Sequence, residues 1–169
     1  MTNQYQGLHR GPIDKQSSSV INIISNAQIG MGDNIKLSTT IPAAELLPRV
    51  EINDTSTDGG YGVAVGGDAD GIYGDGAAPV ANDETFLATV GAGEGVAVVT
   101  QGRCPARVIG QNSSGSGSAI IIGDKLTLGT TDGVLSKALT GNDVIAIALQ
   151  PVVSGELDII AVDIQRSQL

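Results

Sequence analysis

The phrase Gly32-Asp33-Asn34-Ile35-Lys36-Leu37 returns later in the chain as Gly123-Asp124-Lys125-Leu126-Thr127-Leu128. After a polar, Gly-rich interval, each copy is followed by a short apolar run, at residues 61–65 and at residues 145–149. Glycine readily adopts the backbone conformations of tight turns, and alternating apolar and polar residues are typical of half-buried strands. The repeated pattern therefore predicts a Gly-Asp turn, a strand and a returning strand, as in a β-barrel or β-sandwich scaffold.

The sequence around the two copies extends this pattern over most of the chain. Short β-branched or alternating runs predict further strands at residues 20–24, 35–39, 49–53, 86–90, 95–100, 107–109, 119–122, 125–128, 134–138, 144–149 and 157–164. No segment keeps a helical period beyond a turn or two, although residues 42–48 could form one helical turn between two prolines. We therefore expect an all-β fold, a compact β-barrel or sandwich of short strands.

Three stretches of the chain lack this periodicity. Residues 1–19 are polar and predict an extended N-terminal arm. Long Gly/Asp loops are expected at residues 54–60 and 66–76, and the Ser/Gly-rich residues 111–118 predict a flexible surface hairpin loop. We expect residues 20–169 to form a single β domain, which is an ordinary size for one core.

The composition limits both the core and the partners. Of the 169 residues, 41% are hydrophobic but only 2% are aromatic, so the core must consist of Val, Ile, Leu and Ala. The net charge of −9 disfavours nucleic acid as a partner, and the scarcity of aromatic side chains disfavours a stacking platform for bases or sugars. The single cysteine, Cys104, allows no internal disulfide and is most simply a small core or surface residue.

The sequence shows no sign of insertion into a membrane or of export. No apolar stretch approaches the ~20 residues that a membrane-spanning helix needs. The first residues have no charged segment followed by an apolar one, as an export signal would. We therefore expect no membrane partner and synthesis in a cytoplasm.

The chain offers little chemistry for turnover. His9 is the only imidazole, so a Ser-His-Asp or Cys-His arrangement would depend on a residue of the predicted arm. The same count excludes zinc sites of the Cys/His type, and the chain lacks the Gly-x-x-x-x-Gly-Lys-Ser/Thr phosphate loop. We therefore expect a protein that is not an enzyme and has no cofactor.

One group of carboxylates is a weak candidate for a metal site. Asp68, Asp70 and Asp75 surround Gly71, and Ca²⁺ prefers oxygen ligands at alternating positions around a sharp turn. Ile72 occupies the third alternating position, however, and no Glu closes a calcium loop of the usual length. Asp and Gly are also ordinary turn residues, so a plain surface loop and a Ca²⁺- or carbohydrate-binding β-module both remain open.

The C-terminal part of the sequence resembles a known family. The residues that carry the resemblance are the run at 95–102, Gly123-Asp124-Lys125-Leu126-Thr127, Gly133, Ala138, Ile145-Ala146-Ile147-Ala148-Leu149, and Gly155 before a last apolar strand. Together they resemble the capsid decoration (cement) proteins of tailed phages, of the small β-barrel type, over roughly residues 60–164. The usual Ile-Gly-Ile-Ala of the penultimate strand is Ile-Ala-Ile-Ala here, and the arm and the Ser/Gly loop have no residue-by-residue match.

The resemblance implies a viral structural protein on the outer capsid surface of the virion. Such a protein binds the major capsid protein, commonly as a homotrimer, and stabilises the expanded head. We expect the arm residues Tyr5, Leu8, His9 and Arg10 to contact the capsid, because they group aromatic, apolar and cationic side chains in a polar tail. The alternatives are another virion part, such as a head fibre, spike or tail component, and the Ca²⁺- or carbohydrate-binding β-module.

Overall fold

The computed structural model describes residues 19–40, 48–54, 60–66 and 89–165, and all regular structure in these segments is β. The prediction of an all-β fold is therefore confirmed. The strands are β1 (Ser19–Ser25), β2 (Ile29–Gly30), β3 (Asn34–Leu37), β4 (Arg49–Ile52), β5 (Gly62–Gly66), β6 (Thr89–Val90), β7 (Gly95–Asn112), β8 (Lys125–Leu128), β9 (Leu135–Lys137), β10 (Ala146–Ala148) and β11 (Leu157–Ile164). The helical turn considered for residues 42–48 lies almost wholly outside the described residues.

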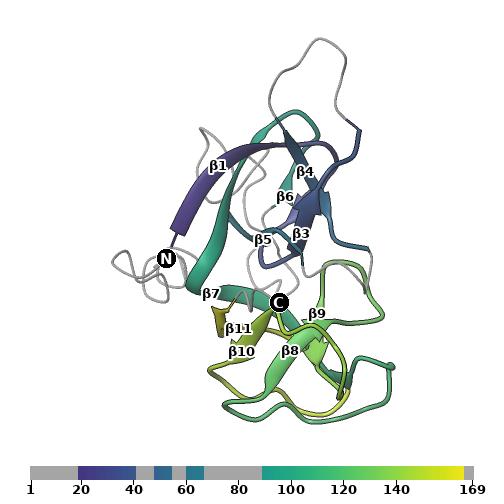
Figure 1. Cartoon of the computed structure of the whole chain (residues 1–169). Coiled ribbons are helices and arrows are strands. Elements are labelled where there is room, and N and C mark those ends of the chain that lie inside the picture. Colours follow the sequence, from purple (N-terminus) through teal and green to yellow (C-terminus); the bar gives the residue numbers. More distant parts are fainter. Residues whose placement is uncertain (1–18, 41–47, 55–59, 67–88, 166–169) are drawn as a thin grey trace, which may run out of the picture.

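Strand pairing closes the chain into two five-stranded barrels that share β7 (Figure 1). The first barrel has the order β1-β4-β3-β5-β7, and the pairing of β7 with β1 closes it. The second barrel has the order β7-β11-β10-β8-β9, and the pairing of β7 with β9 closes it. Strands β2 and β6 form a separate two-stranded sheet. The predicted barrel scaffold is therefore present twice.

The two barrels repeat one topology strand for strand. The strands β1, β3, β4, β5 and the first half of β7 correspond to the second half of β7, β8, β9, β10 and β11. In each barrel one pair is parallel, β1 with β4 in the first and β7 with β9 in the second, and these two pairs correspond. The remaining pairs of each barrel are antiparallel.

The repeated sequence phrase occupies equivalent positions in this duplicated topology. Gly32 donates its backbone N–H to Ala64 O at 2.8 Å, and Gly123 donates to Ala148 O at 2.8 Å. The apolar run after each copy then forms the equivalent strand, β5 in the first barrel and β10 in the second. The sequence repeat therefore reports a structural duplication.

Strand β7 connects the barrels and differs from its prediction. It runs for 18 residues, pairing with β1 up to Gln101 and with β11 from Gly102 onward. Gly102 has a φ of 92°, a conformation that favours glycine, and Figure 1 shows the strand bending between the two barrels. The prediction of two separate strands at 95–100 and 107–109 was wrong, because the pairing continues through Pro105, which lies opposite Ala161.

A second prediction was also wrong, that of a strand at residues 119–122. Only Ile120 makes a β-bridge there, with Val152, through backbone hydrogen bonds of 2.9 and 3.1 Å. The chain cannot continue as a strand because Ile121 is the first residue of the tight turn that ends at Asp124, whose N–H donates to Ile121 O at 3.1 Å. The other predicted strands within the described residues are present, with ends that differ by a few residues.

The Ser/Gly-rich segment forms the surface hairpin that the sequence predicts. Gln111 and Gly117 make a β-bridge across it. The Asn112 side chain organises the turn, since its Oδ1 accepts hydrogen bonds from the backbone N–H groups of Ser114 at 3.0 Å and Ser116 at 3.1 Å. A side-chain carbonyl that replaces a backbone acceptor in this way is typical of Asx turns.

The core is built from small aliphatic side chains, as the composition requires. The cluster inside the first barrel consists of Ile29, Ile35, Val50, Ala64, Val96 and Val98. A larger cluster fills the second barrel, and it also includes Val63, Val65 and Val99 from β5 and the first half of β7. The first barrel therefore contributes side chains to the second core, so the two barrels pack as neighbours with a continuous apolar contact.

Candidate functional site: the barrel junction and an apolar end

The residues singled out by the sequence as candidate contacts or metal ligands are not among those that the structure describes. This holds for Tyr5, Leu8, His9 and Arg10 in the arm and for Asp68, Asp70 and Asp75 in the Gly/Asp loop. Within the described ranges, no group of three or more His, Cys, Asp or Glu side chains could hold a metal ion. The same ranges contain no helix of the length and hydropathy that a bilayer crossing requires.

The repeated Gly-Asp phrase forms the same turn in both barrels. In the first, Asp33 Oδ2 accepts a hydrogen bond from Gly30 N at 2.8 Å, and Gly32 has a φ of 85°. In the second, Asp124 Oδ2 accepts from Ile121 N at 2.9 Å, and the intervening glycine has a φ of 90°. A glycine with positive φ at the third of the four residues is typical of a type II turn. In both turns the carboxylate of the fourth residue accepts a hydrogen bond from the backbone N–H of the first residue.

In the first barrel this turn lies against the second barrel. Arg107 N donates to Gly32 O at 2.8 Å, and Arg107 Nη1 forms an ion pair with Asp33 Oδ1 at 2.7 Å. The Asp33 side chain is buried, and burial raises the pKa of Asp33 above its ordinary value while the Arg107 guanidinium opposes the rise. Space is tight at the contact, since a Cβ on Gly32 would lie 2.9 Å from Arg107 N.

Two buried asparagines complete the contact between the barrels. Asn34 N donates to Gly133 O at 2.7 Å, and Gly133 N donates to Asn53 O at 2.9 Å. The Asn53 amide donates to Asn34 Oδ1 at 2.8 Å, and the Asn34 amide donates to Gly62 O at 3.0 Å. We call Asp33, Asn34, Asn53, Arg107 and Gly133 the barrel junction. It fixes one barrel on the other through the buried hydrogen bonds of Asn34 and Asn53 and the partly buried Arg107–Asp33 ion pair.

No sequence pattern predicted the barrel junction. Asp33 and Arg107 are 74 positions apart, and neither has a local pattern that names its partner. The two copies of the repeated phrase differ at one position that could have indicated the junction: Asn34 in the first copy corresponds to Lys125 in the second. Asn34 is buried and Lys125 is exposed, so the copy with the uncharged residue is the one that faces another barrel.

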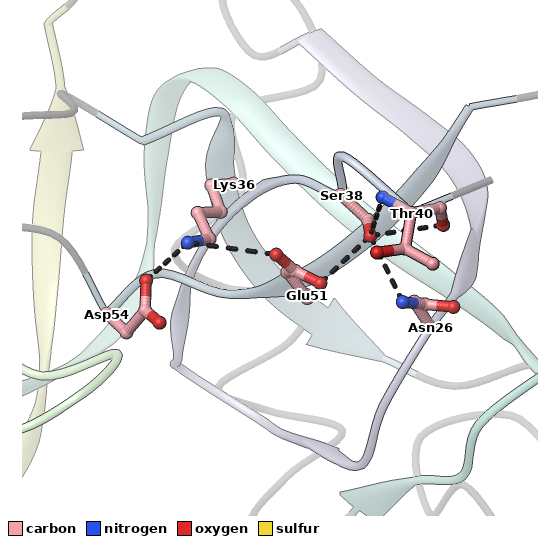
Figure 2. Close-up of polar contacts among 6 residues, drawn as sticks. All are labelled: Asn26, Lys36, Ser38, Thr40, Glu51 and Asp54. Atoms are coloured by element: carbon pink, nitrogen blue, oxygen red, sulfur yellow. Dashed lines mark hydrogen bonds and ion pairs between the residues drawn. The ribbon is translucent and has the colours of Figure 1, made fainter.

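A second polar group lies on the outer side of β3 and β4, and Figure 2 shows its members. Lys36 Nζ lies 3.7 Å from Glu51 Oε1 and forms a further ion pair with Asp54. Glu51 Oε2 accepts a hydrogen bond from Ser38 Oγ at 2.9 Å, and the Asn26 amide donates to the same hydroxyl at 3.1 Å. These side chains link the segment after β1 to both strands, which makes them a brace on the wall of the first barrel.

The far end of the second barrel carries the most exposed aliphatic side chains of the described residues. Ile121, Ile122 and Val153 are 61%, 67% and 63% exposed. They flank the Ile120–Val152 bridge, whose own side chains are buried, and Ala119 and Pro151 beside the bridge are exposed as well. Because successive side chains of an extended chain point to opposite faces, the neighbours of the bridge face outward. We call Ala119, Ile121, Ile122, Pro151 and Val153 the apolar end.

Cys104 lies in the core of the second barrel, which decides between the two places that the sequence left open. Burial raises the pKa of the Cys104 thiol, and the nearby Asp163 carboxylate adds to the rise.

We expect the native protein to react with iodoacetamide at least about a hundredfold more slowly than the protein in denaturant, since only the exposed thiolate is nucleophilic. Mass spectrometry of timed samples measures both rates. Equal rates in the two states would contradict the buried position.

Comparison with known proteins gives similarity to solved structures and none to a family model or a curated protein. No family model matches the sequence, and a comparison with curated proteins finds no match. Among solved structures, the chain is similar to the head fibre gp8.5 N base of bacteriophage phi29, with 15% sequence identity and a TM-score of 0.46. The match covers 90% of this chain and 98% of that chain.

Proposed function

We propose that this chain is a structural protein of a tailed-phage virion, associated with the head, and that it acts by binding and not by turnover. The observation that carries the proposal is where the residues of the family resemblance fall in the fold. Gly123, Gly133 and Gly155 have φ values of 90°, 71° and 82°, and Ala146 and Ala148 are buried in the barrel wall. The three glycines stand where the backbone has positive φ and the two alanines lie fully buried on β10, which supports a resemblance in barrel architecture and not only in composition.

The described structure is suited to a passive load-bearing role. The barrel junction holds two barrels together through buried hydrogen bonds and an ion pair. The two barrels follow one another along the shared strand, which gives an elongated body with one barrel at each end (Figure 1). A net charge of −9 keeps such a protein soluble at the high concentrations that virion assembly needs.

Two positions on the head fit this proposal. As a decoration protein, the chain would bind the major capsid protein on the outer surface and stabilise the expanded head. As the base of a head fibre, it would attach at fewer sites, and the end-to-end arrangement of the barrels suits a part that projects from the surface. Stoichiometry in purified virions separates them, because a decoration protein approaches the copy number of the major capsid protein and a fibre base falls far below it.

The arm remains the proposed capsid contact. We propose that Tyr5, Leu8, His9 and Arg10 bind the capsid by adding backbone and side-chain contacts to an exposed sheet edge, and that copies of the chain associate as a homotrimer. Many weak contacts on a symmetric lattice would add up to stable attachment.

Binding to heads of the phage that encodes the chain tests the proposal. We expect the purified protein to cosediment with expanded heads and the variant lacking residues 2–16 to lose most of that binding. Binding of the truncated variant at the level of the full chain would remove the arm from the proposal while leaving the head as the partner. Failure of the full chain to bind heads, or heads that resist heat equally well with and without it, would overturn the decoration role.

A further inference from the structure

We propose that the apolar end is a contact surface for a second copy of this chain. The inference deepens the proposed function, because it rests on the proposed association of copies of the chain and names the surface through which they meet. It starts from the duplicated topology, which places the turn Gly30–Asp33 of the first barrel and the turn Ile121–Asp124 of the second barrel at equivalent positions. What covers the turn in one barrel therefore indicates what the same turn can bind in the other.

In the first barrel the turn is covered by a barrel of the same topology. Met31, at the second position of the turn, is only 3% exposed. The next residue, Gly32, accepts the hydrogen bond from Arg107 on the second half of β7. The wall of the second barrel therefore covers this turn at Gly32, where a Cβ would lie 2.9 Å from Arg107 N.

In the second barrel the equivalent position is open and more apolar. Ile122 takes the place of Met31 and is largely exposed, with Ile121 beside it where the first barrel has Gly30. The two segments that carry the apolar end lie on the side of the second barrel away from the first barrel, as their green and yellow traces in Figure 1 show. Repeat proteins usually end in a unit with a polar outer face, and the second barrel lacks one at this turn.

The distribution of charge favours a second copy as the occupant. Two molecules that each carry a net charge of −9 repel one another unless the surfaces that meet are free of acidic groups. Residues 119–123 and 148–155, which form the apolar end, contain no charged side chain. Burying several aliphatic side chains of this size per molecule would supply the favourable term, at roughly 25 cal/mol for each Å² removed from water.

The shape of the apolar end is fixed by the backbone beneath it. Gly110 lies against the 153–156 turn, since Gly110 N donates to Glu156 O at 2.8 Å and Gly155 N donates to Gly110 O at 2.7 Å. A Cβ on Gly110 would lie 1.9 Å from Val153 O, so only glycine allows this approach. The outward position of Val153 is therefore built into the fold, and a partner would meet a preformed surface.

Sedimentation equilibrium on the full chain tests the proposal, with single acidic substitutions at matched exposed positions. We expect the wild-type protein to self-associate, and Ile122→Asp and Val153→Asp each to raise the dissociation constant about tenfold or more. Leu139→Asp is the control, because Leu139 is an exposed leucine of the second barrel outside the apolar end, and it should leave the dissociation constant within about twofold. Ile122→Ser repeats the test without new charge if an acidic variant does not fold.

Each outcome decides the proposal. Self-association that Ile122→Asp and Val153→Asp leave unchanged would overturn the apolar end alone and keep the proposed association of copies. Monomeric wild-type protein at the highest soluble concentration would overturn both, even if the chain binds heads. Equal weakening by Leu139→Asp would overturn it as well, since added charge anywhere would then explain the effect. Added salt offers a second readout, because screening of acidic repulsion should strengthen an apolar contact between copies, whereas a contact made by ion pairs would weaken.

Discussion

Asp33→Ala is expected to lower the free energy of unfolding by about 3–5 kcal/mol, well beyond the effect of the equivalent substitution in the other barrel. The change removes the carboxylate that pairs with Arg107 and leaves that guanidinium next to the buried barrel junction without a counter-charge. Within the described residues, Arg107 Nε is already buried without a hydrogen-bond partner, so no second acceptor stands ready for the guanidinium there. Chemical denaturation followed by circular dichroism measures the loss.

The duplication supplies the matched control. Asp124→Ala removes the same acceptor from the same turn, because Asp124 accepts from Ile121 N as Asp33 accepts from Gly30 N. The Asp124–Lys137 ion pair, at 2.8 Å, lies nearer to solvent, where such pairs contribute about 0–1 kcal/mol. With about 1 kcal/mol for the lost turn hydrogen bond, Asp124→Ala should cost about 1–2 kcal/mol. Equal losses in the two variants would show that the barrel junction does not depend on its ion pair.

The pH dependence follows from the direction of the Asp33 pKa. Burial raises the pKa of Asp33 in the folded protein, with Arg107 opposing, so the folded state binds this proton more tightly than the unfolded state does. The stabilisation from this proton is present in full below the ordinary pKa of Asp and is lost as the pH rises through the raised value. The wild type should therefore gain stability relative to Asp33→Asn as the pH falls through that window. A difference that is constant with pH would contradict the raised pKa.

Local sequence patterns predicted the parts of the fold that local physics decides. Strand β11 was predicted with its bounds, because residues 157–164 are rich in β-branched and other apolar side chains and directly follow the turn at Gly155. The two Gly-Asp turns were predicted because a type II turn needs a φ-positive residue, and glycine supplies it at Gly32 and Gly123. Prediction from the sequence fails where one local pattern is compatible with two structures. Pro105 reads as a strand break but is tolerated in β7, and the run of isoleucines at residues 120–122 reads as a strand although two of the three face solvent.

The candidate site was predicted less well than the fold. It depends on which of the two equivalent turns, residues 30–33 or residues 121–124, is covered by another part of the protein. The sequence of each barrel specifies a barrel, but the position of one against the other rests on contacts such as Asp33–Arg107 that join distant residues. The apolar end was not predicted for the same reason, because the sequence alone does not distinguish an exposed isoleucine from a buried one. Only the comparison of equivalent positions distinguishes them, and that comparison requires the topology.

Leu126→Ala is expected to lower the free energy of unfolding by about 3–5 kcal/mol. Leu126 is fully buried on β8, and its cluster contains no aromatic side chain that could move into the space left behind. The loss therefore includes a cavity term in addition to the transfer of the missing methyl groups. Ile35→Ala in the first barrel should cost a similar amount, because Ile35 occupies the equivalent position on β3 and is equally buried.

The two variants together ask whether the barrels unfold as one unit. Val63, Val65 and Val99 belong to the first barrel yet pack in the core of the second, and both barrels share β7. Either substitution should therefore lower the midpoint of one thermal transition of the whole protein. The calorimetric and van't Hoff enthalpies of that transition should be equal. Leu37→Ala serves as the control, because this leucine is two residues from Ile35 on β3 but 44% exposed, and it should change stability by less than about 1 kcal/mol. Two transitions, of which Leu126→Ala moves only one, would mean that the shared strand joins two independent folding units and that the barrel junction is a docking contact between them.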